Sequence, residues 1–147
     1  MIQRIQTIYL AVAFIAMGLL LVFPFSTYAG IEFNSLGFDD GTSVGVTYPL
    51  FINVIISAIL SLLAVFSFKN RKRQILLSRI NFAAVLILLI VMFVDFNQIE
   101  ESLPINKTEI SYGIGMFLPI VALISLLMAN RFITKDEKLI KSMDRIR

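Results

Sequence analysis

Residues 69–96 read KNRKRQILLSRINFAAVLILLIVMFVDF, and this stretch decides the fold class. A cluster of basic residues opens it, and an apolar run follows in which Arg79 is the only charge before Asp95. About 20 residues of α-helix, each rising about 1.5 Å, cover the roughly 30 Å hydrocarbon core of a bilayer. A basic flank before an apolar run of this length is typical of a helix that enters a membrane from the cytoplasm.

Three further stretches share this character, so we expect an all-α membrane protein with a four-helix transmembrane bundle. The chain is 58% hydrophobic with a mean hydropathy of +0.86, whereas soluble domains are about 45–50% apolar. Because a backbone in lipid has to satisfy its own hydrogen bonds, each stretch is predicted to be helical. The expected spans are residues 5–24, 49–68, 75–96 and 110–130 of one domain that covers residues 1–147.

The charges predict the orientation of these spans. Apart from Lys107, the Lys and Arg residues lie before the first span, in the connection that leads into the third span, with Arg79 just inside that span, or after the fourth span. The other two connections are acidic. The positive-inside rule then places both termini and the connection at residues 69–79 in the cytoplasm of a bacterial inner membrane. The first apolar run is longer than that of a signal peptide, so we expect it to be retained as a helix.

The connections and the tail carry weaker patterns. Alternating residues on either side of Asp39-Asp40-Gly41 predict a short outer β-hairpin within residues 25–48. The connection at residues 97–112 is expected to be irregular. Thr134 and Glu137 fit a capping box, and apolar residues at helical spacing follow them. We therefore expect a separate amphipathic helix over residues 134–147 at the cytoplasmic surface.

Arg79 lies too close to Asp95 for the fifteen uncharged residues between them to cross a membrane alone. The simplest interpretation is that Arg79 reaches out to the phosphate headgroups. A second is that Arg79 pairs with Asp136 or Glu137 and so docks the tail helix on the bundle. A substrate-binding role is a third.

Polar and helix-breaking residues mark two further places. Asn53, Ser57 and Ser61 recur every fourth residue and share one helical face, which is typical of a polar seam between helices. A polar pathway for a solute is the alternative. Pro119 cannot donate a backbone hydrogen bond to the Gly115 carbonyl, so a kink near Gly115 is expected. Such breaks usually shape packing, but they mark binding sites in some transporters.

The composition excludes several kinds of chemistry. The chain has no cysteine and no histidine, so it cannot form disulfides, zinc sites with these ligands or histidine-ligated haem, and it has no histidine base. We therefore predict no catalytic, cofactor-binding or metal-binding residues, and no enzyme. The basic cluster at residues 69–73 lacks interleaved aromatic residues and follows an apolar span, which favours anionic headgroups over nucleic acid as its partner.

Several polar stretches are also distinctive. They are MIQRIQTIYL at residues 1–10, NRKRQI at 70–75, RIN at 79–81, ANR at 129–131, KDEKL at 135–139 and SMDRIR at 142–147. In these the chain resembles the four-span inner-membrane proteins of Bacteroidota known as domain of unknown function 4293. The resemblance covers essentially the whole chain and implies a Gram-negative inner membrane, but it brings no activity and no functional residues.

Two functions are consistent with these patterns. The first is a structural or accessory subunit of a larger inner-membrane assembly. As partners we expect the bilayer with its anionic headgroups and either another membrane protein or further copies of the chain. Surface patterning without buried chemistry favours this hypothesis. The alternative is a small transporter or lipid-binding protein, which the lack of a carboxylate deep in any span makes less favourable.

Overall fold

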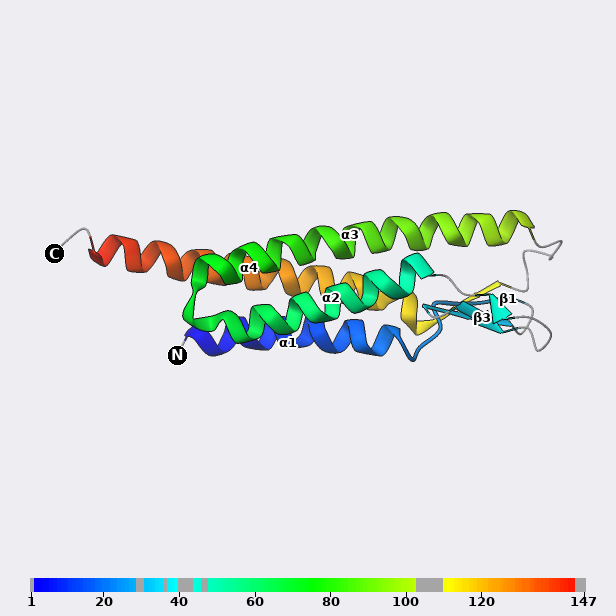
Figure 1. Ribbon diagram of the computed structural model, residues 1–147, viewed down its shortest axis with the longest axis horizontal. Helices are drawn as coiled ribbons and strands as arrows, with labels where there is room; N and C mark the ends of the chain where they lie inside the picture. The colour runs from blue at the N-terminus through cyan, green and yellow to red at the C-terminus, as the bar shows by residue number, and fades with distance from the viewer. Residues whose placement is uncertain are drawn as a thin grey trace.

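The computed structural model describes residues 2–28, 31–35, 37–39, 44–45, 48–102 and 110–144. Within these ranges, four α-helices run along the length of the molecule and a five-stranded sheet lies at one end (Figure 1). The N-terminus, the connection between the second and third helices, and the C-terminus lie toward the other end. The helices are α1 (Ile2–Leu20), α2 (Tyr48–Phe66), η1 (Ser67–Lys69), α3 (Arg71–Ser102), η3 (Ile114–Phe117) and α4 (Leu118–Asp144).

The connection between α2 and α3 is short and well capped. The single turn of η1 ends at Asn70, whose side-chain Oδ1 accepts a hydrogen bond from the backbone N–H of Arg73 at 3.2 Å. The Asn70 carbonyl accepts the first helical bond of α3, from Gln74 at 3.0 Å. Asparagine is a favoured N-cap because its side chain replaces a missing helical partner. This tight turn sets α2 and α3 side by side and antiparallel.

The core runs down the middle of the bundle. On α1 it includes Leu10, Ala13 and Met17, and on α4 it includes Leu126 and Ile133, all fully buried. The α1 positions are three and four residues apart and the two α4 positions are seven residues, or two turns, apart, so each helix presents one apolar stripe to the others. Small residues such as Ala13 let the helix backbones approach closely.

The sheet joins two connections that are far apart in the sequence. Its strands are β1 (Ser26–Tyr28), β2 (Ile31–Asn34), β3 (Gly37–Asp39), β4 (Val44–Gly45) and β5 (Ile110–Tyr112), in the antiparallel order β4-β3-β2-β1-β5. Ser26 pairs with Phe33 on one side and with Tyr112 on the other. The hydroxyl of Ser35 donates to the Leu20 carbonyl at 2.9 Å, which fastens the sheet to the end of α1.

The outer connections differ from the prediction, and the fold is mostly helical with a small sheet. The chain reverses between Asp39 and Val44, as the turn signal suggested, but β4 faces β3 and not the segment around Phe33. The chain reverses a second time between Asn34 and Gly37, where the sequence has no strong turn signal. The expectation that residues 97–112 are irregular is wrong at both ends, because α3 continues to Ser102 and β5 pairs with β1. Residues 40–43, 46–47 and 103–109 lie outside the described residues.

The predicted kink at Gly115 and Pro119 is wrong. The expected span at residues 110–130 begins instead with β5 and η3, and α4 starts only at Leu118. The Gly115 carbonyl accepts a hydrogen bond from the Leu118 N–H. The carbonyl therefore has a partner although Pro119 has no N–H to donate. Proline in the first turn of a helix replaces an N–H that would have no helical partner.

The predicted start of a separate tail helix at Thr134 is also wrong. Helix α4 continues through Thr134 to Asp144, while residues 145–147 lie outside the described residues. No glycine or proline follows Pro119, and Lys, Glu, Leu and Met favour helix, so nothing interrupts the helix there. The last turns of α4 extend past the end of the bundle beside the N-terminus (Figure 1).

Two helices of the described chain are long and apolar enough to cross a membrane, over Arg71–Val94 and Ile114–Ile140. The apolar helical segments Ile5–Leu20 and Leu50–Phe66 are shorter. This criterion uses length and composition only, and core helices of soluble proteins also meet it.

Gly115 gives a test of this packing. Its N–H donates to the Pro24 carbonyl at 3.0 Å, and a Cβ on Gly115 would lie 2.7 Å from the carbonyl oxygens of Phe23 and Pro24. We expect Gly115→Ala to lower the free energy of unfolding by about 1–3 kcal/mol, as overpacking does. The measurement is thermal unfolding in detergent. Gly18→Ala is the control: a Cβ there meets no atom within 4 Å, so it should be neutral or stabilising, and equal effects of the two variants would contradict this account.

Candidate functional site: polar residues within the bundle

A buried cluster of three side chains joins α2 to α3. Asn81 of α3 lies between Ser57 and Ser61 of α2, and all three are fully buried. The Ser57 hydroxyl donates to Asn81 Oδ1 at 2.7 Å, and Asn81 Nδ2 donates to the Ser61 hydroxyl at 2.7 Å. Two of the three predicted seam residues thus contact a single amide on the neighbouring helix.

Asn81 was missed at the sequence level, although a signal for it exists. In an antiparallel helical hairpin, residues equally distant from the turn face each other. Ser57 and Asn81 are equidistant from Lys69, which lies in the η1 turn. A search for polar residues at matched distances from the basic connection would have identified this pair.

The polar face of α2 is not satisfied along its whole length. Asn53, the third predicted seam residue, is half-buried, and its Oδ1 is buried with no hydrogen-bond partner among the described residues. On α3, the Ser78 hydroxyl is also buried without a partner in that part of the chain. In the part of the chain that the structure describes, the side-chain hydrogen bonds between α2 and α3 are those of the three residues of the cluster.

A second polar contact joins the two ends of the chain. Gln6 of α1 and Asp136 of α4 are 4% and 6% exposed, and Gln6 Nε2 donates to Asp136 Oδ2. Nearby, the rings of Tyr9 and Phe132 stack with centroids 5.6 Å apart and an interplanar angle of 11°. The end of α4 is therefore attached to α1.

The partner of Asp136 is Gln6 and not Arg79, which was its partner in the second interpretation of Arg79 above. Arg79 lies exposed on α3, and Glu137 is half-buried beside Asp136. The prediction that Arg79 reaches out to the headgroups is not tested by these contacts. Of the two predicted tail acids, Asp136 faces the bundle, where it contacts α1.

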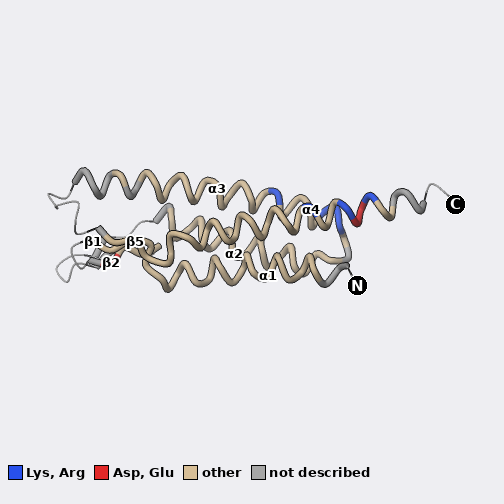
Figure 2. Tube along the Cα trace, turned by 180° about the vertical axis from the view of Figure 1, so that it is seen from behind, with Lys and Arg blue, Asp and Glu red and all other residues tan. Residues whose placement is uncertain are grey.

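The described cations gather at one end of the molecule. Every Lys and Arg residue coloured in Figure 2 lies in the half that contains both termini, and the sheet occupies the opposite end. Two groups stand out, Arg71, Lys72 and Arg73 in the first turn of α3, and residues 131, 135 and 138 along α4. The molecule is therefore polarised along its axis.

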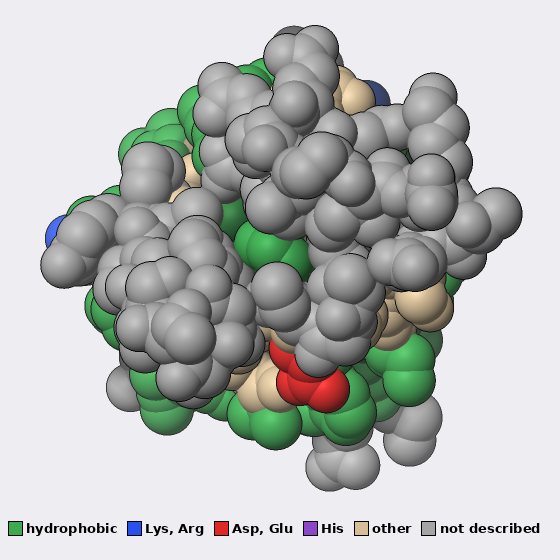
Figure 3. Space-filling view, turned by 90° about the vertical axis from the view of Figure 1, so that its right-hand side faces the viewer, with side chains coloured by type: hydrophobic (Ala, Val, Ile, Leu, Met, Phe, Trp, Pro, Cys, Tyr) green, Lys and Arg blue, Asp and Glu red, His purple; other side chains and the backbone are tan. Residues whose placement is uncertain are grey.

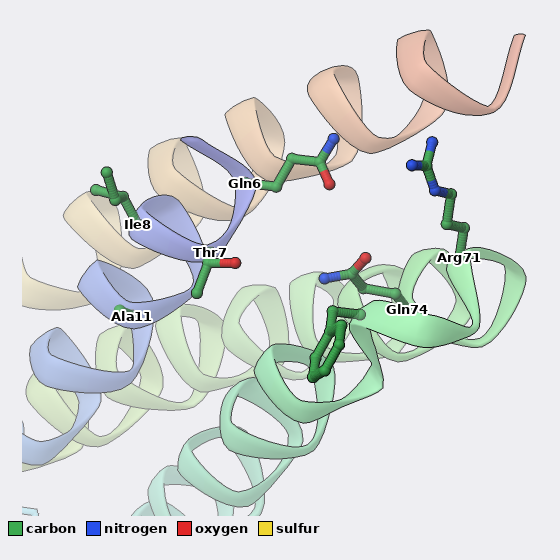
Figure 4. A pocket seen from close by; sticks show the side chains of 7 residues that line it. Gln6, Thr7, Ile8, Ala11, Arg71 and Gln74 are labelled. Atoms are coloured by element: carbon green, nitrogen blue, oxygen red, sulfur yellow. The ribbon is translucent and has the colours of Figure 1, made fainter. Parts of the chain in front are cut away.

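Two grooves open beside these cations. The first has a volume of about 360 Å³ and lies between α1, η1 and the start of α3 (Figure 4). It is lined by Gln6, Thr7, Ile8, Ala11, Phe68, Arg71 and Gln74. The second, about 410 Å³, follows α4 and is lined by Leu127, Asn130, Arg131, Thr134, Lys135 and Lys138. Both combine apolar walls with cations.

The chemistry of these residues points to packing and binding. Among the described residues, no group of three or more His, Cys, Asp or Glu side chains converges to hold a metal ion. The cluster of Ser57, Ser61 and Asn81 offers hydroxyls and an amide, which neither accept nor release protons at neutral pH. It can hold two helices in register.

Comparison with known proteins gives a family but no activity. A family model described as Domain of unknown function (DUF4293) matches residues 2–146. None of the curated proteins and none of the solved structures compared matches the chain. No ligand or reaction can be transferred from a relative.

The central cluster makes a prediction about stability. Asn81→Ala leaves two buried serine hydroxyls without their partner, so we expect the free energy of unfolding to fall by about 1–3 kcal/mol. Asn53→Ala is the matched control, because its Oδ1 has no partner to lose among the described residues. Thermal unfolding in detergent measures both. If Asn53→Ala destabilises the protein as much as Asn81→Ala, the hydrogen bonds are not the cause.

The contact between Gln6 and Asp136 makes a prediction about the end of α4. Gln6→Leu leaves a buried carboxyl group unpaired, so we expect tryptic cleavage near Lys138 to accelerate about tenfold. Arg79→Ala should leave that rate unchanged, since Asp136 contacts α1. Faster cleavage in Arg79→Ala and not in Gln6→Leu would show that α3 docks the tail instead.

Proposed function

This chain belongs to the family described as Domain of unknown function (DUF4293), and from that premise we propose that it is an integral membrane protein with four spans. We propose further that it serves as a structural or accessory subunit of a membrane assembly and not as an enzyme. The family description carries no activity, so the support comes from the surface of the bundle.

The observation that carries the proposal is the number of large apolar side chains that face outward on all four helices. Examples with their exposed fractions are Ile15 of α1 at 56%, Ile52 of α2 at 53%, Ile90 of α3 at 62% and Ile124 of α4 at 54%. Figure 3 shows hydrophobic side chains around the rim of the bundle as well, seen from the sheet end. Isolated exposed apolar residues are ordinary, but a continuous belt of them needs a partner or lipid to cover it.

Burial separates this bundle from the core of a soluble protein. Only 33% of the most apolar 18-residue window is buried in α3, and the same is true of α4. A soluble protein would bury most of such helices. Lipid offers the alternative, because acyl chains are as apolar as leucine side chains.

The lengths of α1 and α2 fit a membrane too. Each has 19 residues, or about 28 Å, close to the thickness of the hydrocarbon core. They pack beside the two longer helices and carry their own exposed isoleucines, so the same belt of lipid would surround all four. This supports four crossings of the membrane.

The axial polarity supports an orientation. The cations of the described residues lie at the end with both termini, which the positive-inside rule assigns to the cytoplasm. The sheet then lies on the outer face of a bacterial inner membrane. The two edges of this sheet are β4 and β5.

Helix α4 supports a role in assembly. Its last turns extend past the bundle and carry both cations and apolar residues, with Leu139 at 47% and Ile140 at 37% exposed. A mixed apolar and basic helical surface fits either a protein partner or the headgroup region. An accessory subunit would use such a surface to dock.

The test is affinity purification of the tagged chain in a mild detergent, followed by native electrophoresis and mass spectrometry. We expect a second membrane protein at a fixed ratio, and we expect Ile140→Ser to reduce its yield several-fold. The matched control is Ile90→Ser, which removes the same side chain from the belt. If the chain migrates alone or as a homo-oligomer, the accessory-subunit proposal is wrong and transport or lipid binding takes its place.

A further inference from the structure

The groove between α1 and the start of α3 has a polar part and an apolar part. In Figure 4 the side chains of Thr7, Gln74 and Arg71 surround its opening, with Gln6 above. Ile8 and Ala11 continue the lining along α1, and Phe68 completes it from η1. Its volume of about 360 Å³ lies within the usual range for small-molecule sites, about 300–1,000 Å³.

Gln74 is the first sign that the groove takes a ligand. The residue is only 2% exposed, and Figure 4 shows its amide directed across the groove toward α1. The backbone N–H of Gln74 donates to Asn70, and within the described chain the structure gives its side-chain amide no hydrogen bond. The amide is not one of the fully buried polar groups that lack a partner, because it opens onto the groove that the residue lines. Its N–H groups are available to an acceptor.

The cations of α3 indicate the charge of that ligand. Arg71, Lys72 and Arg73 occupy the first turn of α3, and no acid accompanies them. The N-terminus of a helix is already positive, so cations there weaken the helix. An anion in the groove would offset this repulsion, and helix N-termini are favourable places for phosphate groups. Asp136 does not line the groove, and the Gln6 amide donates to its carboxylate.

The apolar walls indicate the source of the anion. Ile8 is 59% exposed and Ile15, two turns further along α1, is 56% exposed, so an apolar strip leads from the groove toward the middle of the bundle. A soluble phosphate has no apolar surface to bury against this strip, whereas a lipid acyl chain would cover it. The groove lies at the end of the bundle, where headgroups would be if the helices cross a membrane.

We propose that this groove binds an anionic phospholipid of the cytoplasmic leaflet, with its phosphate held by Arg71 and Gln74 and one acyl chain along Ile8 and Ile15. This inference rests on the proposed membrane crossing. The groove thereby becomes a specific lipid site and not merely part of a basic surface. The lipid would brace the α1 and α3 ends against each other.

The experiment is native mass spectrometry of the purified full chain in detergent, titrated with phosphatidylglycerol or phosphatidylcholine. We expect one phosphatidylglycerol per chain to be retained in preference to phosphatidylcholine. Arg71→Gln should weaken that retention about tenfold, since it removes a charge-assisted hydrogen bond. Arg131→Gln is the matched control, because it removes a cation from the other groove, and it should retain the lipid.

Gln74→Leu separates binding from folding. We expect weaker retention of phosphatidylglycerol together with an unchanged or higher melting temperature in lipid-free detergent, because the amide makes no hydrogen bond within the described chain that the variant would break. A lower melting temperature would mean that Gln74 serves the packing of the protein and would overturn its role in binding.

Other results would overturn the site. They are equal retention of the two lipids, equal losses in Arg71→Gln and Arg131→Gln, or displacement of the lipid by millimolar inorganic phosphate, which would identify a soluble anion as the ligand. Alkaline carbonate extraction of membranes distinguishes the two proposals. Release of the chain by carbonate would overturn both proposals, whereas loss of lipid selectivity in a carbonate-resistant chain would overturn only the lipid site.

Discussion

The four helices carry more large apolar side chains than their shared interior can bury, and this surplus constrains everything else in the structure. The interior is filled by residues such as Ala13, Leu126 and Ala129, while many isoleucines and phenylalanines of the helices face outward. Water would disfavour such a surface and lipid would cover it. In lipid the backbone has to pair within each helix, so strands belong only beyond the apolar belt. The sheet does lie at one end of the bundle, where β1 follows α1 and β5 precedes η3 and α4.

When apolar packing cannot distinguish one helix partner from another, polar contacts have to fix the arrangement. Asn81 with its two serines joins α2 to α3, and Gln6 with Asp136 joins α1 to α4. At the sheet end, the segment before α4 is attached to the segment after α1. There the backbone N–H groups of Gly113 and Gly115 donate to the carbonyls of Phe25 and Pro24 at 3.0 Å. Each helix is thus attached to a neighbour by a directional contact.

The sequence predicts the helices better than their ends. Apolar composition located α1 and α2 to within a few residues, but it placed the end of the third span near Phe96, although α3 continues to Ser102. Periodicity cannot show where a polar helix stops, because exposed polar residues suit both helix and loop. The strand pairing of Ile110–Tyr112 with Ser26–Tyr28 was also out of reach, since it depends on two connections more than 80 residues apart meeting at one end.

Local signals misled where tertiary context overrode them. The capping box at Thr134 is real as a pattern, but capping matters only where a helix begins, and α4 is already formed there. Pro119 breaks a helix only where a full turn of helix precedes it. Here α4 begins at Leu118, one residue before Pro119. Of the candidate site residues, the serine pair on α2 could be read from spacing alone. Gln74 could not be recognised, because its importance lies in its place on the groove, which no sequence pattern reports.

The most direct test of four crossings is labelling of single cysteines with a membrane-impermeant maleimide, which this cysteine-free chain permits without prior substitution. The positions are Thr27→Cys after α1, Lys72→Cys between α2 and α3, Ser111→Cys between α3 and α4, and Lys138→Cys near the end of α4. Intact spheroplasts should label only the cysteines at positions 27 and 111, and inverted vesicles only those at 72 and 138. Labelling of position 138 together with 27 in spheroplasts, or of all four positions from one side, would contradict the four-span bundle.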